Sequence, residues 1–295
     1  MRYGLHRSEN KSRERRSHAL RPKVQSQLTP FLETVASAPQ ALLMLDYDGT
    51  LAPFHTQRDR AFPYSEAVPF LQEIMRNGRT RLVLITGRDA PTVPPLLNVH
   101  PRPEIWGAYG LQRLRTDGSM DMPHLDERTL EGLSDADRWL RYQRLRHTAE
   151  FKAASIAVHW RGLSKSDTDN LRARVLLGWR LIASTSGLNL LEFDGGLEIR
   201  APRADKGNAV RILLNEVGLQ VPAAYLGDDA TDESAFRVMQ GRGISVLVRS
   251  IWRRTAAQLW LKPPDDLLDF LKQWLQACSQ HDTSNVSATA AANKS

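Results

Sequence analysis

Cysteine is almost absent from this chain, and so is any long apolar run. Cys278 is the single cysteine among 295 residues, which excludes an intramolecular disulfide and argues against a cysteine-based zinc site. A reducing compartment suits such a chain, so we expect a cytoplasmic location. No apolar stretch approaches the roughly 18 residues of a membrane-spanning helix, and no membrane partner is expected. Zinc-ligand spacings, a P-loop and internal repeats are also missing.

Positive charge is concentrated at the N-terminus. The formal net charge is +7, and residues 1–26 hold eight Lys or Arg against two Glu, so the remainder is close to neutral. Such a polar end is typical of a solvated arm, and we expect residues 1–26 to be a disordered basic tail and no nucleic acid to bind. Residues 279–295, rich in Ser, Ala and Asn, are predicted to form a second disordered tail.

The strongest local signal is residues 41–51, with the sequence ALLMLDYDGTL. Five apolar residues without alternation predict a strand buried on both faces, as in the centre of a parallel sheet. Asp46 and Asp48 follow at its carboxyl end, where open α/β sheets bind ligands, and Gly49 allows a sharp turn. Neighbouring carboxylates repel each other unless a cation binds or one is protonated. The pattern favours Asp46 as a nucleophile toward phosphorus and Asp48 as a general acid over a simple Asp-Gly turn.

Three further segments place polar groups at the ends of strands or helices. A buried strand over 81–85 ends in Thr86, whose hydroxyl can donate to a phosphoryl oxygen, although an ordinary glycine turn is equally compatible with this segment. Lys206 opens a helix, where a lysine either reaches a phosphate or lies on the surface. After a strand over 223–226, four acidic residues in six positions would repel one another without a cation, although acid-rich helix starts also occur.

These segments resemble the motifs of the haloacid dehalogenase-like (HAD) phosphotransferases, in which a nucleophilic Asp makes an aspartyl-phosphate with magnesium alongside. Asp46-x-Asp48-Gly-Thr-Leu resembles the first motif and the Thr86-Gly-Arg turn the second. Asp-Lys206-Gly-x-Ala resembles the third motif. The run Gly-Asp228-Asp-x-Thr-Asp-Glu resembles the fourth, in the form typical of trehalose-6-phosphate phosphatases.

Between the second and third motifs the sequence becomes more polar. A helix-prone stretch over 127–147 precedes a strand-like run over 151–160, an amphipathic helix over 167–177, and strand-like runs over 181–184 and 188–193. This order predicts an α+β unit inserted into the parallel fold, which would serve as a lid.

The inserted unit carries a second resemblance. Glu150-x-Lys152, followed by a strand that ends in His159-x-Arg161, resembles the cap of trehalose-6-phosphate phosphatases, whereas alternation alone would place His159 on a solvated strand face. The Glu-x-Arg-x-Pro run that starts at Glu198 resembles the return to the core in the same family.

The resemblance implies a Rossmann-like parallel sheet, the HAD core, over 27–110 and 198–278, with an α+β cap over 111–197. It implies Asp46, Asp48, Thr86 and Lys206 as catalytic residues. Mg²⁺ would be bound by Asp46, Asp48 and Asp228, with Asp232 in support. The implied substrate contacts are Gly87, Arg88, Glu150, Lys152, His159, Arg161 and Glu198.

The expected activity is hydrolysis of trehalose 6-phosphate, a small-molecule sugar phosphate, as a step of trehalose biosynthesis. Alternatives with the same fold are a phosphatase of sucrose phosphate or mannosylglycerate phosphate and a phosphomutase; a non-catalytic sugar-binding module is the alternative from another class. Tyr109 stands where the family often has His, which weakens the expectation for the substrate. A trehalose-phosphate synthase is a candidate partner, and the oligomeric state is left open.

Overall fold

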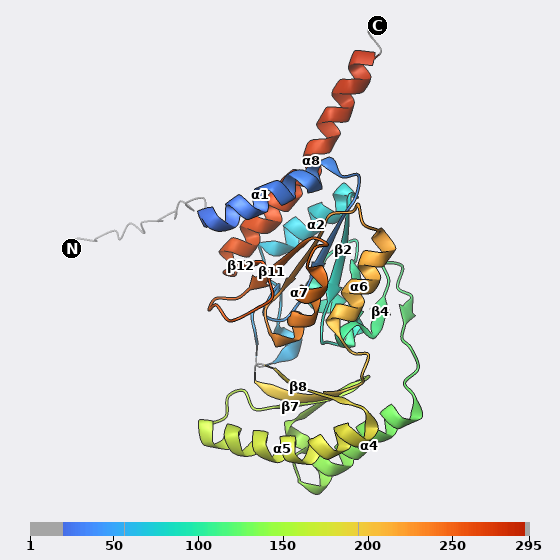
Figure 1. Cartoon of the computed structure of the whole chain (residues 1–295), viewed down its shortest axis with the longest axis vertical. Helices are drawn as coiled ribbons and strands as arrows, with labels where there is room; N and C mark the ends of the chain where they lie inside the picture. The colour runs from blue at the N-terminus through green and yellow to red at the C-terminus, as the bar shows by residue number, and fades with distance from the viewer. Residues whose placement is uncertain (1–19, 56, 194, 293–295) are drawn as a thin grey trace, which may run out of the picture.

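The computed structural model describes residues 20–55, 57–193 and 195–292, with side chains described as far as Ser279. Two sheets organise the molecule, and each is covered by its own helices (Figure 1). In spatial order, the strands of the larger sheet are β12 (Leu259–Leu261), β11 (Ile244–Val248), β10 (Ala223–Gly227), β1 (Ala41–Leu45), β2 (Thr80–Ile85), β3 (Glu104–Gly107), β4 (Gln112–Leu114) and β5 (Met120–Asp121).

The larger sheet is parallel from β12 through β3, and β4 and β5 continue it antiparallel. All five residues of β1 are buried, because helices cover both faces of the sheet. Leu43 and Leu45 pack with α1 (Pro22–Ser37), α2 (Ala67–Asn77) and α8 (Asp265–Ala292). Leu42 and Met44 pack with α6 (Lys206–Val217) and α7 (Glu233–Met239) on the other face. This layering confirms the predicted α/β class with a parallel Rossmann-like sheet.

The smaller sheet has the strand order β6 (Ala149–Lys152), β7 (Ser155–His159), β9 (Gly196–Arg200) and β8 (Asn189–Phe193), all antiparallel. The helices α4 (Glu127–Tyr142) and α5 (Lys165–Ser186) cover the face turned away from the larger sheet (Figure 1). Trp179, fully buried, lies at the centre of this second core. Short helical segments are η1 (Arg58–Arg60), η2 (Ala90–Thr92), α3 (Pro94–Leu97), η3 (Ala108–Gly110), η4 (Arg146–Thr148) and η5 (Ala230–Asp232).

Two strand predictions within this unit were wrong. The run 181–184 is helical, because buried residues four apart continue the face of α5 through Ala183 while Leu181 points outward. The run 151–160 is divided between β6 and β7, which pair as an antiparallel hairpin. In one continuous strand Lys152 and His159 would lie on opposite faces. Because they belong to different strands of the hairpin, both can face the same side.

The predicted boundaries between the units need two corrections. β4 and β5 lie within the predicted cap range 111–197, yet they extend the larger sheet. β9 pairs with β7 and β8 along its whole length, so residues 198–200 belong to the smaller sheet and not to the core. Strand pairing sets both boundaries, and local composition does not reveal it.

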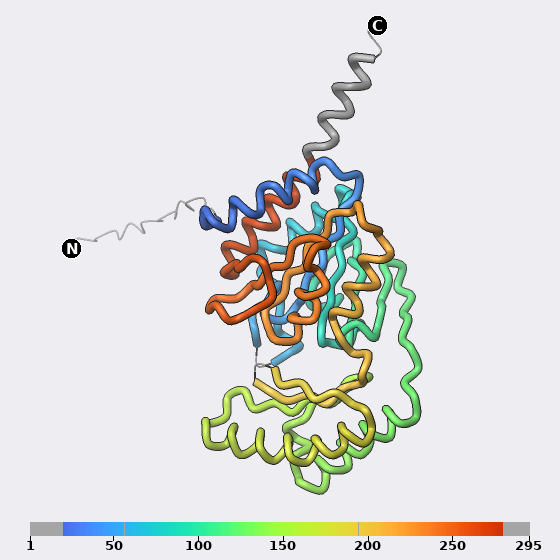
Figure 2. The backbone as a smooth tube through the Cα atoms, viewed as in Figure 1, coloured from blue at the N-terminus to red at the C-terminus, as the bar shows by residue number. Residues whose placement is uncertain are grey.

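The ends of the described chain are more ordered than predicted. α1 begins at Pro22, and Leu20 and Val24 are buried, so the last residues of the predicted 1–26 tail belong to the fold. Residues 1–19 lie outside the described part. α8 continues to Ala292, where a disordered tail over 279–295 was predicted, because alanine favours a helix. Figure 2 shows α1 and α8, from opposite ends of the chain, side by side. No helix of the described ranges is long and apolar enough to cross a membrane.

Candidate active site

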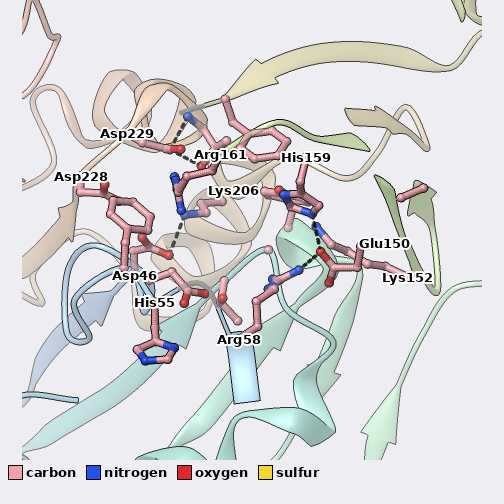
Figure 3. A pocket seen from close by; sticks show the side chains of 18 of the residues that line it. Asp46, His55, Arg58, Glu150, Lys152, His159, Arg161, Lys206, Asp228 and Asp229 are labelled. Atoms are coloured by element: carbon pink, nitrogen blue, oxygen red, sulfur yellow. Dashed lines mark hydrogen bonds and ion pairs between the residues drawn. The ribbon is translucent and has the colours of Figure 1, made fainter. Parts of the chain in front are cut away.

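A cavity of about 450 Å³ lies between the carboxyl edge of the larger sheet and the smaller sheet (Figure 3). The ends of β1, β2 and β10 and the start of α6 supply its floor, and the β6–β7 hairpin supplies its roof. Because the floor strands are parallel and adjacent, their carboxyl ends bring together residues far apart in the sequence. The volume lies in the range typical of small-molecule sites.

Asp46 and Lys206 form a buried ion pair on the floor. Lys206 Nζ donates to Asp46 Oδ1 at 2.7 Å and to Asp232 Oδ1 at 2.8 Å. Burial raises the pKa of Asp46 to about 8, because Lys206 offsets only part of the desolvation and Asp232 adds to it. Burial by itself would lower the pKa of Lys206, but Asp232 and Asp46 outweigh it and the pKa is raised. The lysine is therefore a permanent positive charge beside Asp46.

Asp228 completes an acidic cluster that fits a divalent cation. Ligand oxygens of Asp46, Asp228 and Asp232 lie within 4.8 Å of one another. Asp228 is 2% exposed, and its Oδ2 has no hydrogen-bond partner among the described residues. Burial, with Asp229 and Asp46, raises the pKa of Asp228 well above its usual value. A buried carboxylate oxygen without a donor is the group that a hard cation would satisfy.

Asp232 holds the site together instead of offering a free ligand oxygen. Its Oδ1 accepts hydrogen bonds from Lys206 and from the Tyr225 hydroxyl, and its Oδ2 accepts from the main-chain N–H groups of Asp228 and Asp229. Both oxygens are thus engaged, and the residue is fully buried. The supporting role at the metal that was predicted for Asp232 stays a prediction; in the structure its carboxylate contacts Lys206 and the Asp228 loop.

Thr86 and Gly87 line the cavity, whereas Arg88 lies behind Asp48. The Thr86 hydroxyl oxygen accepts from the Arg88 N–H at 3.2 Å, so its own proton can be donated into the cavity. Arg88 is 5% exposed, and its Nε and Nη2 donate to the two carboxylate oxygens of Asp48 at 2.7 and 2.6 Å. Arg88 was predicted to contact substrate; in the structure its guanidinium contacts Asp48 instead.

The roof brings four of the predicted substrate residues to the cavity: Glu150, Lys152, His159 and Arg161. His159 Nε2 lies 3.0 Å from Glu150 Oε2, so the residue faces the cavity and not a solvated strand face (Figure 3). Burial, together with Arg58 and Lys152, lowers the pKa of His159 to about 4. The imidazole is therefore neutral at physiological pH and can both donate to and accept from a sugar hydroxyl.

Glu198 is fully buried and does not line the cavity. Its carboxylate accepts hydrogen bonds from Lys152 Nζ at 2.8 Å and from the hydroxyls of Ser155 and Tyr109. Burial opposes the charge of Glu198, but Lys152 and the hydroxyl donors outweigh it and lower the pKa. Tyr109, on η3 of the larger unit, thus contacts a strand of the smaller sheet through Glu198.

Several cavity residues were not predicted from the sequence, chiefly Phe54, His55, Arg58 and Phe193. Phe54 and Arg58 belong to the loop after the first motif, which carries no local pattern typical of a site. Arg58 forms an ion pair with Glu150 across the cavity. That pairing depends on how the two units pack together, and the residues in the loop do not reveal it.

The chain shares its fold with a haloacid dehalogenase-like hydrolase from B. subtilis, which has a TM-score of 0.55 at 17% identity, covering 79% of this chain and 99% of that one. The trehalose-phosphatase family model matches residues 44–262, so the chain belongs to the trehalose-phosphatase family.

Three similar proteins illustrate this membership. An uncharacterized glycosyl hydrolase of Mycobacterium tuberculosis is 30% identical over 85% of this chain, which spans 20% of that protein's length. Trehalose-phosphate phosphatase B of Arabidopsis thaliana is 26% identical over 85% of this chain and 71% of its own. The C-terminal domain of the C. albicans trehalose-6-phosphate phosphatase has a TM-score of 0.71 at 17% identity, covering 84% of this chain and 96% of that one.

Proposed function

We propose that the chain hydrolyses trehalose 6-phosphate to trehalose and phosphate through an aspartyl-phosphate on Asp46. The observation that supports this most directly is the single cavity in which Asp46, Lys206 and Asp228 face the cap residues Glu150 and Lys152. Family membership points to the same substrate, since the Arabidopsis relative is named a trehalose-phosphate phosphatase.

In the first step, a carboxylate oxygen of Asp46 attacks phosphorus, the bond from phosphorus to the sugar oxygen breaks, and Asp48 gives its proton to that oxygen. In the second step, Asp48 takes a proton from water and the water oxygen attacks phosphorus. The bond from phosphorus to the Asp46 oxygen breaks, which releases phosphate and regenerates Asp46. Lys206 and the Thr86 hydroxyl stabilise the charge on the phosphoryl oxygens.

Asp48 must change partners between these two steps. Both carboxylate oxygens of Asp48 accept hydrogen bonds from the Arg88 fork, so neither oxygen is placed to donate a proton in this arrangement. To act as an acid, Asp48 must carry a proton, and the fork must then loosen on at least one oxygen. We therefore regard the Arg88–Asp48 pair as the part of the site that alternates between the half-reactions.

Mg²⁺ is the proposed metal, held by Asp46, the Asp48 main-chain carbonyl and Asp228. When bound, it would supply positive charge to the phosphoryl group and relieve the repulsion among the buried carboxylates. A cytoplasmic location and a trehalose-phosphate synthase partner remain predictions of the sequence.

Release of phosphate by the purified chain, with and without Mg²⁺, tests the proposal on a panel of sugar phosphates. We expect trehalose 6-phosphate to have the highest kcat/KM, and Asp46→Asn to lower kcat by at least about 10³-fold because the amide is not a nucleophile. The far-UV circular dichroism of the variant should match the wild type. A preference for sucrose phosphate, or normal turnover by Asp46→Asn, would contradict the substrate or the mechanism respectively.

A further inference from the structure

Arg58 connects the two units at the mouth of the cavity. It opens η1 in the loop after the first motif, and its side chain reaches across to form an ion pair with Glu150 of β6 (Figure 3). Its main-chain carbonyl lies on the core side and accepts a hydrogen bond from Arg88 Nη1 at 2.8 Å. Neither the family motifs nor the proposed chemistry accounts for this residue.

The carbonyl of Arg58 helps to fix the Arg88 guanidinium. Arg88 is buried, and its described contacts are the two carboxylate oxygens of Asp48, the Arg58 carbonyl, and the Tyr47 ring, whose centroid lies 5.3 Å away. The guanidinium is planar, so a displacement of the Arg58 carbonyl changes the orientation of the whole group. A shift of η1 therefore changes the direction in which Arg88 holds Asp48.

The cap side of the connection is also well defined. Glu150 Oε2 is shared between Arg58 and His159, which lies 3.0 Å away. A second contact joins the same loop to the cap, because the Arg161 guanidinium lies 4.5 Å from the centroid of the Phe54 ring. Movement of the cap would therefore change two contacts of the loop after the first motif, Arg58 with Glu150 and Phe54 with Arg161.

We propose that Arg58 is a positioning residue that couples closure of the cap to the orientation of Asp48. With the cap seated, Glu150 holds Arg58, the Arg58 carbonyl holds Arg88, and Arg88 directs Asp48 toward the departing sugar oxygen. With the cap displaced, the ion pair is lost and Asp48 is less well aimed. The inference rests on the proposed function for the identity of the leaving group and for the role of Asp48 as the acid that protonates it.

The leaving group offers a direct test. A sugar alkoxide must be protonated as it departs, whereas p-nitrophenolate leaves without a proton, so only the first step of the sugar phosphate needs Asp48 as an acid. The second step, in which Asp48 activates water, is common to both esters, so the comparison is made on the single-turnover rate of leaving-group release. We expect Arg58→Gln to lower this rate for trehalose 6-phosphate about fivefold, the effect that a partly exposed ion pair can have. The loss with p-nitrophenyl phosphate should be much smaller, and Arg58→Lys should restore part of the sugar-phosphate activity.

Two controls complete the experiment. Arg60→Gln removes an exposed charge from the same helical turn and should leave both rates unchanged. In a double-mutant cycle with Glu150→Gln, the two losses in the single-turnover rate should be less than additive, because the Arg58–Glu150 ion pair is lost in either case while Glu150 also faces the substrate. Additive effects, equal losses on both substrates, or no loss on either would overturn the coupling.

Failure of the proposed function would look different. A wild-type chain that hydrolyses another sugar phosphate would overturn the substrate alone, and the same leaving-group comparison with that sugar phosphate would decide the role of Arg58. A wild-type chain with no phosphatase activity toward either class of ester would overturn both proposals.

Discussion

Buried charge is the main feature of this site at the level of single residues. Asp46, Asp228 and Asp232 surround one lysine, so the described cluster holds more negative than positive charge. Such an arrangement is costly in a protein interior unless a cation or a protonated carboxyl offsets it. Across the cavity the charges are mixed, because Arg58, Lys152 and Arg161 lie near His159. Glu150 pairs with Arg58, and Glu198 pairs with Lys152. The site thus combines an acidic floor with paired charges of both signs opposite it.

The protonation state of His159 can be predicted from that environment. Its pKa of about 4 in the fold lies below the ordinary 6.5, so the unfolded chain binds the proton over the interval between them. The contribution of His159 to stability is therefore present above pH 6.5 and lost as the pH falls toward 4.

An NMR titration of the His159 ring carbons should show a midpoint well below 6.5. His159→Gln should also flatten the pH dependence of the free energy of urea unfolding between pH 6.5 and 4. A midpoint at or above 6.5 would contradict the basic surroundings described for this residue.

The sequence reveals some of these residues and hides others, for a physical reason. Asp46, Thr86 and Asp228 each follow an apolar strand directly, so local pattern alone places them at the carboxyl edge of the sheet. Arg58 and Tyr109 are different, because their contacts with Glu150 and Glu198 cross between the units. Nothing near them in the sequence encodes how the cap rests on the core.

At the level of elements, the turn after β1 is fixed by glycine. Gly49 has φ +86°, and a Cβ at this position would overlap the carboxylate of Asp228. The close approach of the β1 turn to the β10 loop is what brings Asp46 and Asp228 together. The glycine in the first motif thus serves the geometry of the metal cluster as well as the turn.

Gly49→Ala should therefore lower the free energy of unfolding by more than backbone strain alone would, because the added Cβ also overlaps Asp228. Gly78, at the end of α2, has φ +76° and open space around its Cβ position, so Gly78→Ala is a matched control. We expect the control to lose about 1–2 kcal/mol of unfolding free energy and Gly49→Ala to lose about 1–3 kcal/mol more.

Only Gly49→Ala should also weaken Mg²⁺ binding, because it displaces Asp228. Chemical denaturation and isothermal titration calorimetry would measure the two effects. Equal stability losses, or unchanged metal affinity in Gly49→Ala, would show that the carboxylate moves aside freely.

Elements that alternate with glycine or proline breaks were predicted well, and those defined by pairing were not. β1, β2, β10 and β11 lie close to the expected positions because each is a short apolar run between clear breaks. Most of β9 was assigned to the core, although it pairs with β7 and β8 and therefore belongs to the smaller sheet. The helix predicted over 167–177 was too short, because α5 continues to Ser186 through the run that was predicted to be a strand.

At the level of the whole molecule, a bound metal should stabilise the folded chain by mass action. The acidic cluster exists only when the ends of β1 and β10 are held side by side, so the unfolded chain has no equivalent site. Mg²⁺ at 100 times its Kd should add about 2.7 kcal/mol to the free energy of unfolding.

Thermal unfolding with increasing Mg²⁺, against an EDTA control, would measure this as a rise in Tm. Asp228→Asn should unfold without metal at a temperature no lower than wild type, because burial already disfavours the ionised form of Asp228 and raises its pKa. It should then show no rise in Tm on adding Mg²⁺. A rise equal to that of wild type would place the metal elsewhere.

The pairing of α1 with α8 has a consequence for how such a module can be built into longer polypeptides. Both helices lie on the side of the larger sheet remote from the smaller unit (Figure 1). Additional domains joined before α1 or after α8 would extend from that remote pole and leave the entrance between the units unobstructed.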